Sequence, residues 1–428
     1  MLRSATGLNM NQNELKMKVL WLSNVYISDN EISSTGTWII AMAKRLQQEK
    51  NINLFIISKG DVGDIEQKDN GNIKQWILPN AELNKEGLPP QNLIFSIQEI
   101  INGINPDIIH IWGTEYYWSK LYTEGYIKGK VLLEMQGLIS AIATKVTADL
   151  TFREMIDCIG FKEILKPTTF LLCRKKYFEK RGALEIDTIS KHKHIATQSD
   201  WMRGYIRNIN KEAKIYRSAI GLRPEFLNTT PHNYSVNNLE LFTLTSTISA
   251  YKGLHTLIKA LAIVKSQYKD VILKIAGPLP VKGVKKPGYE RFLQRLIIKH
   301  DLSNNVKWLG SLNAIELIGE MKKSRIVVLP SFIESYSLAL REALTIGMPV
   351  VASFAGAMPE LANHNKSAIY FPPGDFQLCA HAIVEILTSK ELEESLRINA
   401  LQKARELNRV DCGTVQIEIY QQIMFSEG

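Results

Sequence analysis

The chain has 428 residues, more than one hydrophobic core usually holds, so two domains of roughly 200 residues each are expected. Apolar residues make up 45% and charged residues 22%, which is typical of a packed globular protein and excludes a disordered or fibrous chain. The formal net charge of +9 favours anionic partners, without choosing among phosphates, nucleic acid and a membrane surface.

The N-terminal half alternates short apolar runs with amphipathic helix patterns. The first strand is predicted over 18–23 (KVLWLS), followed by a helix over 37–48 with Gly36 at its entrance. A later helix starts at Asp200, which is a good N-cap residue. Strands separated by helices of this length indicate βαβ units and a parallel sheet. The other elements expected here are strands at 53–58, 108–111, 131–134 and 194–197, and a helix at 91–101.

A second series of the same kind follows a polar stretch at 229–238 that is typical of a linker. A last helix pattern covers 414–425, after a loop at 408–413. The sequence therefore predicts an α/β protein of two doubly wound, Rossmann-like domains, 1–218 and 219–411. Ligands of such domains bind at the carboxyl ends of the strands, here in a cleft between two sheets. The strands expected in this half are 239–244, 271–276, 306–309, 326–329, 350–352 and 368–371, with two helices over 376–405.

The cysteines and the first residues bear on the compartment. Cys158, Cys173, Cys379 and Cys412 form no C-x-x-C pair, which fits a reduced protein without a disulfide framework or a zinc cage. The N-terminal run MLRSATGLNMNQNELKMK lacks the apolar stretch of a signal peptide, and no window reaches the about 18 consecutive apolar residues of a spanning helix. A cytoplasmic protein is predicted, at most attached to a membrane surface.

The run LPSFIESYSLALREALTIGMPVV at 329–351 carries the most chemistry. A buried strand ends at its start, and Ser335 or Ser337 can cap a helix that Gly347 terminates. The free N–H groups and positive dipole end of such a helix form a ready site for phosphate.

Two carboxylates flank this helix start. Glu334 lies just before it and Glu342 about two turns inside, which separates them by roughly 12 Å, too far to share one proton or one metal ion. Hydroxyl groups are donors that carboxylates accept well, so the spacing suits an elongated ligand with phosphates in the middle, such as a sugar nucleotide. The alternative is that Glu342 merely pairs with a neighbouring Arg or Lys.

With these motifs the sequence resembles the retaining glycosyltransferases of the family 4 type, which have the two-domain fold called GT-B. Glu334 and Glu342 match the E-x7-E element of that family. The resemblance covers nearly the whole chain, in the family's order and spacing, and it implies that the C-terminal helix, 412–428, packs back onto the first domain. The matching segments are PDIIHIWGTE from Pro106, LEMQGL from Leu133, YKGLHTLIKAL from Tyr251, KIAGP from Lys274, VKWLGSL from Val306, VLPSFIESYSLALREA from Val328 and MPVVASFAGAMPEL from Met348.

The resemblance implies a role for each matching residue. Lys252, in the K-G pair, would neutralise the donor diphosphate and assist its departure. Glu342 would bind the ribose hydroxyls, and Glu334 a hydroxyl of the transferred sugar. The distal phosphate would meet three backbone N–H groups, those of Tyr336, Ser337 and Leu338.

Two glycines are weaker matches of the same kind. The resemblance places Gly310 where it would open room for the base, although a plain turn glycine explains it equally well. Gly36 would face the phosphates in the first loop, where relatives usually have a pair of glycines and this chain has one.

Two positions depart from the family pattern. Many relatives have an Arg six residues before the K-G lysine, where this chain has Ser246, so another cation for the diphosphate is expected. Many relatives place a His before the glycine near the acceptor, where this chain has Gln136, which can position a hydroxyl but cannot act as a general base. His110 ends a different strand, and it is either a packed, hydrogen-bonded histidine or an acceptor-side group.

The resemblance implies a retaining transferase of the hexosyltransferase type, with front-face departure and attack. The protein then supplies positioning and electrostatic stabilisation of the leaving diphosphate. No metal cofactor is predicted, because no D-x-D element stands in a suitable loop and Lys252 with the helix end would supply the positive charge. The expected partners are a nucleotide sugar and a glycan or lipid-linked acceptor in polysaccharide biosynthesis, and no nucleic acid.

The long helical stretch 138–192 interrupts the alternation and carries basic and apolar residues around 170–178 (FLLCRKKYF). This segment is interpreted either as a surface for an anionic membrane that holds a lipid-linked acceptor, or as an ordinary solvated helix face.

Two other functions stay open. One is a GT-B phosphorylase or sugar-nucleotide epimerase, although no cofactor lysine or extra phosphate-binding cations can be located for phosphorolysis. The other is a partner protein that binds a sugar nucleotide or glycan without turnover, which the missing Arg and His equivalents would suit. An NAD-dependent dehydrogenase is disfavoured, because the turn after the first strand reads NVYISDNE and lacks G-x-G-x-x-G.

Overall fold

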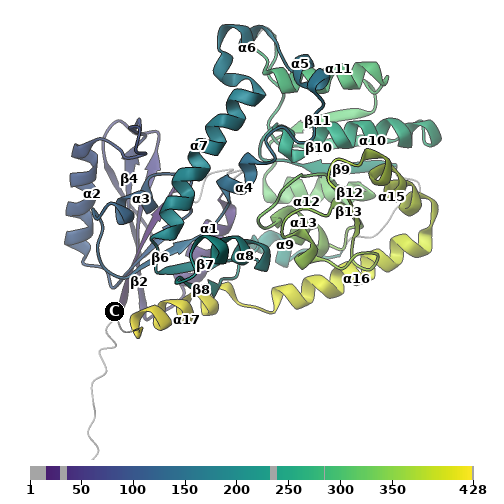
Figure 1. Ribbon diagram of the computed structural model, residues 1–428. Helices are drawn as coiled ribbons and strands as arrows, with labels where there is room; N and C mark the ends of the chain where they lie inside the picture. Colours follow the sequence, from purple (N-terminus) through teal and green to yellow (C-terminus); the bar gives the residue numbers. More distant parts are fainter. Residues whose placement is uncertain (1–15, 29–35, 232–238, 284, 427–428) are drawn as a thin grey trace, which may run out of the picture.

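The computed structural model describes residues 16–28, 36–231, 239–283 and 285–426, and within them the chain forms two α/β units (Figure 1). The first unit is built on an eight-stranded sheet of order β3-β4-β2-β1-β5-β6-β7-β8. The second has a six-stranded sheet of order β11-β10-β9-β12-β13-β14, in which every pairing is parallel. The predicted α/β class with two doubly wound sheets is confirmed. Part of the expected linker, 232–238, lies outside the described residues.

The strands are β1 (Met17–Ser23), β2 (Ile52–Gly60), β3 (Glu66–Asn70), β4 (Ile73–Pro79), β5 (Ile108–Trp112), β6 (Val131–Glu134), β7 (His194–Thr197), β8 (Lys214–Arg217), β9 (Glu240–Leu244), β10 (Ile272–Ala276), β11 (Val306–Gly310), β12 (Ile326–Leu329), β13 (Val350–Ser353) and β14 (Ile369–Phe371). The helices that precede β9 in the chain include α1 (Thr37–Leu46), α2 (Gln91–Ile104), α3 (Trp118–Thr123), α4 (Ile139–Ala143), α5 (Phe152–Asp157), α6 (Phe161–Leu165), α7 (Leu171–Ser190) and α8 (Asp200–Ile209). The later helices are α9 (Pro224–Leu227), α10 (Leu254–Gln267), α11 (Gly288–Lys299), α12 (Ala314–Lys323), α13 (Leu338–Thr345), α14 (Met358–Leu361), α15 (Phe376–Thr388), α16 (Lys390–Asn408) and α17 (Cys412–Met424).

The buried strands match the sequence prediction closely, because a strand covered on both faces is a continuous apolar run. Strands β5, β6 and β12 are buried at every position. Strand β3 was not predicted, since its sequence EQKDN is polar throughout and mostly exposed at the edge of the sheet, where it pairs antiparallel with β4. The predicted cap of α8 was wrong by one residue: Ser199 is the N-cap, its Oγ accepting from Met202 N at 3.2 Å, and Asp200 begins the helix.

The last helix, α17, packs against the first unit rather than the second (Figure 1). Its Tyr420 is fully buried, and the Oη of that side chain accepts a hydrogen bond from Trp21 Nε1 on β1 at 2.9 Å. At the start of the helix, Asp411 pairs with Arg45 of α1 at 2.8 Å. The two units are therefore connected by the segment after β8 and again by the short segment between α16 and α17.

No helix in the described part of the chain is both long enough and apolar enough to cross a membrane.

Candidate functional site

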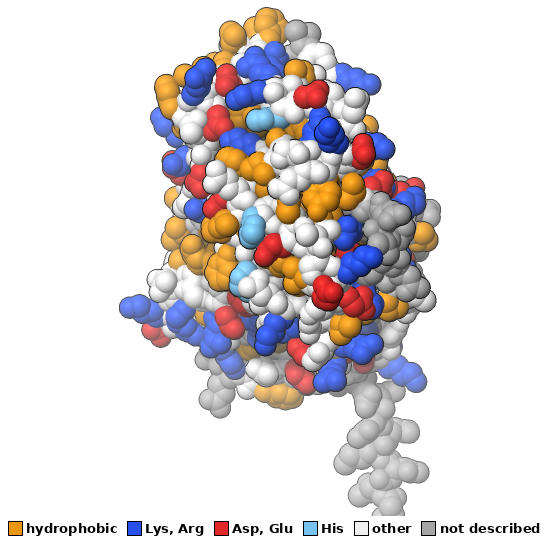
Figure 2. All heavy atoms as spheres, turned by 90° about the vertical axis from the view of Figure 1, so that its right-hand side faces the viewer, with side chains coloured by type: hydrophobic (Ala, Val, Ile, Leu, Met, Phe, Trp, Pro, Cys, Tyr) orange, Lys and Arg blue, Asp and Glu red, His pale blue; other side chains and the backbone are white. Residues whose placement is uncertain are grey.

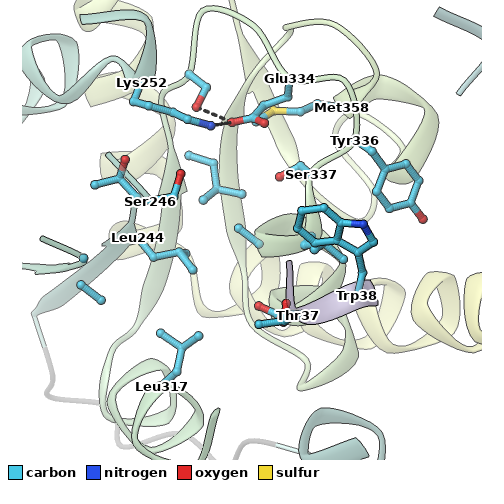
Figure 3. A pocket seen from close by; sticks show the side chains of 18 of the residues that line it. Thr37, Trp38, Leu244, Ser246, Lys252, Leu317, Glu334, Tyr336, Ser337 and Met358 are labelled. Carbon is cyan, nitrogen blue, oxygen red and sulfur yellow. Dashed lines mark hydrogen bonds and ion pairs between the residues drawn. The ribbon is translucent and has the colours of Figure 1, made fainter. Parts of the chain in front are cut away.

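A cavity of about 330 Å³ opens between the two units at the carboxyl ends of the second sheet (Figure 3). The last residues of three strands line it: Leu244 of β9, Ala276 of β10 and Leu329 of β12. From the first unit, Gln136 after β6 and the beginning of α1 complete the wall. Parallel packing brings these strand ends together, which is the usual position of a ligand in such sheets.

The start of α13 points into this cavity. Its N-cap is Ser337, whose Oγ accepts from Leu340 N at 3.2 Å, which decides between the two predicted caps. Ser335 instead donates its hydroxyl to the carbonyl of Gln136 at 2.7 Å, a contact between the two units. Tyr336, Ser337 and Leu338 all line the cavity. The first N–H groups of a helix have no intrahelical acceptor, so this end can bind an anion.

Glu334 and Lys252 form an ion pair in the cavity wall. Lys252 Nζ donates to Glu334 Oε1 at 2.7 Å, and Ser331 Oγ donates to the same oxygen at 2.8 Å (Figure 3). Burial opposes the charged form of Lys252, but the attraction and hydrogen bond of Glu334 outweigh it and raise its pKa. The backbone requires the glycine of the K-G pair. Gly253 has φ +73°, and a Cβ there would lie 1.9 Å from the carbonyl oxygen of Pro330.

Glu342 is also held by a cation in the cavity. Arg223 donates from Nε and Nη2 to Glu342 Oε1 at 3.0 and 2.8 Å, and both residues line the cavity. The Glu342 residue is 4% exposed, and this burial raises its pKa although Arg223 acts in the opposite direction. The ion pair that was the alternative to ligand binding by Glu342 therefore exists. It lies inside the cavity, so Glu342 can pair with Arg223 and still bind a ligand.

One geometric expectation needs correction. Glu342 is the fifth residue of α13, little more than one turn inside the helix rather than two. The residues from Pro330 to the cap are loop, so the spacing of roughly 12 Å, which assumed a continuous helical rise, does not apply. The two carboxylates nevertheless line the same cavity.

The structure brings some of the other predicted residues to the cavity and leaves others out. Ser246 and Gln136 line it, and the Gln136 side-chain nitrogen Nε2 is buried without an acceptor among the described residues. Gly36 and Gly310 have positive φ angles of 81° and 80° but are not lining residues. Their neighbours take those positions, namely Thr37, Trp38, Ser311 and Leu312. The roles of all these residues in binding stay predictions.

His110 is packed in the first unit and does not reach the cavity. It is 0% exposed, its Nδ1 lies 2.7 Å from Tyr420 Oη, and its ring stacks on Trp112 at 4.2 Å between centroids. Its Nε2 lies 3.2 Å from Glu134 Oε2, and burial lowers the pKa of His110 despite that carboxylate. The packed alternative is therefore the one the structure supports, and His110 is not among the residues that line the cavity.

Sequence reasoning missed two charged residues. Arg223 gave no signal, because its partner Glu342 is 119 residues away. Glu115 ends the segment PDIIHIWGTE, and it lines a second cavity of about 290 Å³ in the first unit together with Glu185 and Arg181. The only hint in the sequence was a glycine near each side of the position that the Glu115 carboxylate takes. The structure gives the reason: a Cβ at Gly113 would lie 1.9 Å from Glu115 Oε2, and one at Gly137 would lie 3.1 Å from Oε1.

Glu115 should make stability depend on pH. Burial, helped by the nearby Glu185, raises the pKa of Glu115 from 4.5 to about 7. Between these values the folded state keeps a proton that the unfolded state has released, so the free energy of unfolding falls as pH rises. Glu115→Gln should match the parent at pH 4.5 and exceed it at pH 8 by about 3 kcal/mol in urea unfolding. A stability difference that does not change with pH would contradict this assignment.

Comparison with known proteins finds similarity to glycosyltransferases. Residues 233–403 match the family model described as "Glycosyl transferases group 1". The chain is 26% identical over 209 residues to a D-inositol 3-phosphate glycosyltransferase of Jonesia denitrificans, covering 48% of this chain and 45% of that protein. The Corynebacterium urealyticum protein of the same name is 22% identical over 353 residues, which cover 81% of this chain and 79% of that protein. The amylovoran biosynthesis glycosyltransferase AmsK of Erwinia amylovora is 28% identical, with 40% and 42% covered.

Solved structures show the same two-domain arrangement. The sucrose-phosphate synthase of Thermosynechococcus elongatus superposes with a TM-score of 0.72 at 14% identity, covering 96% of this chain and all of that one. The Anabaena protein HepE, solved in complex with UDP and glucose, gives a TM-score of 0.65 at 17% identity, with 95% and 99% covered. These likenesses confirm the predicted GT-B fold. The match spans about half the length of the first curated relative and four fifths of the second.

Proposed function

We propose that the chain is a retaining glycosyltransferase of the hexosyltransferase type, since residues 233–403 match the family model of the group 1 glycosyl transferases. It would move a sugar from a nucleotide-sugar donor to a glycan or lipid-linked acceptor in polysaccharide biosynthesis. The observation that carries the proposal is one cavity lined by a helix start and by two acid–cation pairs, Lys252–Glu334 and Arg223–Glu342.

The chemistry follows from charge placement. As the bond between the sugar C1 and the diphosphate oxygen breaks, negative charge grows on the diphosphate, and Lys252 with the N–H groups of α13 stabilises it. The acceptor oxygen bonds to C1 on the same face, and its proton passes to a phosphate oxygen of the leaving group. Glu334 fixes a sugar hydroxyl and Glu342 the ribose hydroxyls, so that the reacting atoms stay aligned. Gln136, whose Nε2 is buried without an acceptor among the described residues, would position the acceptor.

A UDP sugar is the first donor to test. HepE is described in complex with UDP and glucose, and a trehalose-6-phosphate protein of E. coli with UDP-2-fluoro glucose. We propose that no metal takes part, because Lys252 and the start of α13 both line the cavity and would supply the positive charge.

A donor panel tests the function directly. The protein is incubated with UDP-, GDP-, ADP- and dTDP-sugars, each with magnesium and with EDTA, and released nucleotide and sugar are followed. We expect slow hydrolysis of one donor, unaffected by EDTA, with the anomeric configuration of the first-formed sugar retained by NMR. Tight nucleotide binding without turnover of any donor would support the non-catalytic partner instead, the alternative that Ser246 favours.

We propose that the protein is cytoplasmic and attaches to the inner face of the cell membrane through α5 and α6. Four large apolar side chains of these helices are exposed by 52 to 71%: Phe152, Phe161, Ile164 and Leu165. Basic residues stand among them in sequence. Of the three acids there, Glu154 pairs with Lys259, Asp157 lies 3.7 Å from Arg295, and Glu163 is buried. Figure 2 shows apolar and basic side chains together at the upper end of the molecule, where Figure 1 places α6. This surface lies just before the predicted segment 170–178.

Liposome sedimentation tests this attachment. The protein should bind vesicles that contain anionic phosphatidylglycerol and bind neutral phosphatidylcholine vesicles weakly, because apolar insertion and charge attraction add. The double variant Ile164→Glu, Leu165→Glu should lose at least about tenfold in partitioning. The control is Ile315→Glu, a change at a similarly exposed residue (73%) of α12. Equal loss in the control, or no binding by the parent, would refute attachment at this surface.

A further inference from the structure

The donor cavity contains two cations and two acids among its described lining residues, and each cation is bound to one acid. Lys252 holds Glu334, and Arg223 holds Glu342. A diphosphate brings about two negative charges, whereas Lys252 and a helix start together offer about one and a half positive charges. Ser246, which stands where many relatives of the resembled family have an Arg, lines the same cavity but carries no charge. The phosphate position therefore needs another cation.

Arg223 lies close enough to be that cation. Its partner Glu342 follows Leu338, the first residue of α13, by four residues, so both lie on one face of the helix and about 6 Å apart along its axis. Side chains of a helix tilt toward its N-terminus, which brings the carboxylate and its bound guanidinium nearer to the phosphate-binding end. Arg223 is thus within about one helical turn of the place predicted for the phosphate.

The guanidinium of Arg223 is held in one orientation, and only some of its N–H groups donate hydrogen bonds. Its centre lies 4.8 Å from the ring of Phe226, and two of its five N–H bonds, one from Nε and one from Nη2, go to the single oxygen Oε1 of Glu342. The Nη1 edge donates to no residue in the described ranges. An Arg placed in this way can bind a carboxylate on one edge and a phosphate on the other.

We propose that Arg223 is the second phosphate-binding cation of the donor cavity and does the work of the arginine absent at Ser246. This role rests on the proposed function. Ribose hydroxyls take up the remaining acceptor positions of Glu342, while the free N–H edge of Arg223 binds a phosphate oxygen. One ion pair then recognises both the ribose and the diphosphate of the donor.

Calorimetry with a nucleoside, its monophosphate and its diphosphate, using the base that the donor panel selects, tests the role. Arg223→Gln should weaken diphosphate binding about 10- to 100-fold and nucleoside binding less than about threefold, because only the phosphate contact loses its charge. Arg223→Lys should keep most of the diphosphate affinity. Adding Ser246→Arg to Arg223→Gln should restore diphosphate affinity. The exposed Arg203→Gln serves as the control for loss of one positive charge elsewhere.

The possible outcomes distinguish failure of the role proposed for Arg223 from failure of the proposed glycosyltransferase function. Equal losses for nucleoside and diphosphate would mean that Arg223 only positions Glu342, and would overturn the proposal, as would failure of Ser246→Arg to rescue. If the parent binds and hydrolyses a donor but Arg223→Gln binds the diphosphate as tightly, this role alone fails. If the parent binds no nucleotide of the panel, the proposed function fails and this role fails with it.

Discussion

Lys252→Ala will reduce the rate of donor turnover about 10²- to 10³-fold, because one preorganised charge at a developing oxyanion has an effect of that size. The loss should fall on kcat as much as on kcat/KM, since the leaving diphosphate gains charge only as its bond to the sugar breaks. Binding of the nucleoside should be nearly unchanged, because Lys252 pairs with Glu334 and not with the ribose-binding acid. Initial rates over a range of donor concentrations measure both parameters.

Lys259→Ala is the matched control for this variant. Lys259 forms an ion pair with Glu154 at 2.6 Å, with side-chain exposures of 22% and 20%, close to the 19% and 17% of Lys252 and Glu334. It does not line the donor cavity. Its removal should leave kcat within about twofold of the parent, since surface pairs of this kind contribute little. A Lys252 variant as active as this control would remove Lys252 from the mechanism.

Glu342→Ala will weaken binding of the nucleoside about 10- to 100-fold, and binding of the nucleotide sugar at least as much. The ribose loses a charged acceptor, and Arg223 loses the carboxylate that orients it. Glu334→Gln should show the opposite pattern, with normal nucleotide affinity and slow turnover, because Glu334 binds Lys252 and its proposed ligand is the transferred sugar. Calorimetry on the nucleoside separates the two variants.

A buried ion pair elsewhere provides the control for Glu342. Arg325 binds Glu393 through Nε and Nη2 to one oxygen, at 2.8 and 2.6 Å, the same pairing pattern as Arg223 and Glu342. Glu393→Ala should lower the melting temperature, because it leaves a buried charge unpaired, without changing nucleotide affinity. If both variants lose affinity equally, the effect of Glu342 is one of stability and its assignment to ribose is wrong.

The sequence was most informative where burial imposes a pattern. Strands such as β12 are apolar throughout and were predicted at their observed bounds, and the Gly347 stop of α13 agrees with its φ of +77°. The polar β3 could not be found, since pairing with β4 and not hydrophobic burial makes it a strand. The residue at which α13 begins was likewise not predictable, so the prediction placed Glu342 one turn too deep in the helix.

Which contacts of the site could be predicted depended on how far apart the two residues lie in the sequence. The residues around 334–342 lie within one segment, and their common cavity follows from a strand end and a helix start. The pairs that cross the fold carry no such signal. Arg223 meets Glu342 over 119 positions and His110 meets Tyr420 over 310, so their partners emerge only when the chain has folded.

The position of α17 has a consequence for how the protein forms in the cell. The first sheet is made from residues translated early, yet Ile419, Tyr420 and Ile423 fill one side of its core. Trp21 donates its indole hydrogen to Tyr420, a residue that is translated 399 positions later. The first unit therefore keeps an open apolar face until the whole second unit and α17 have been synthesised. A chain shortened by α17 would leave that face exposed for good.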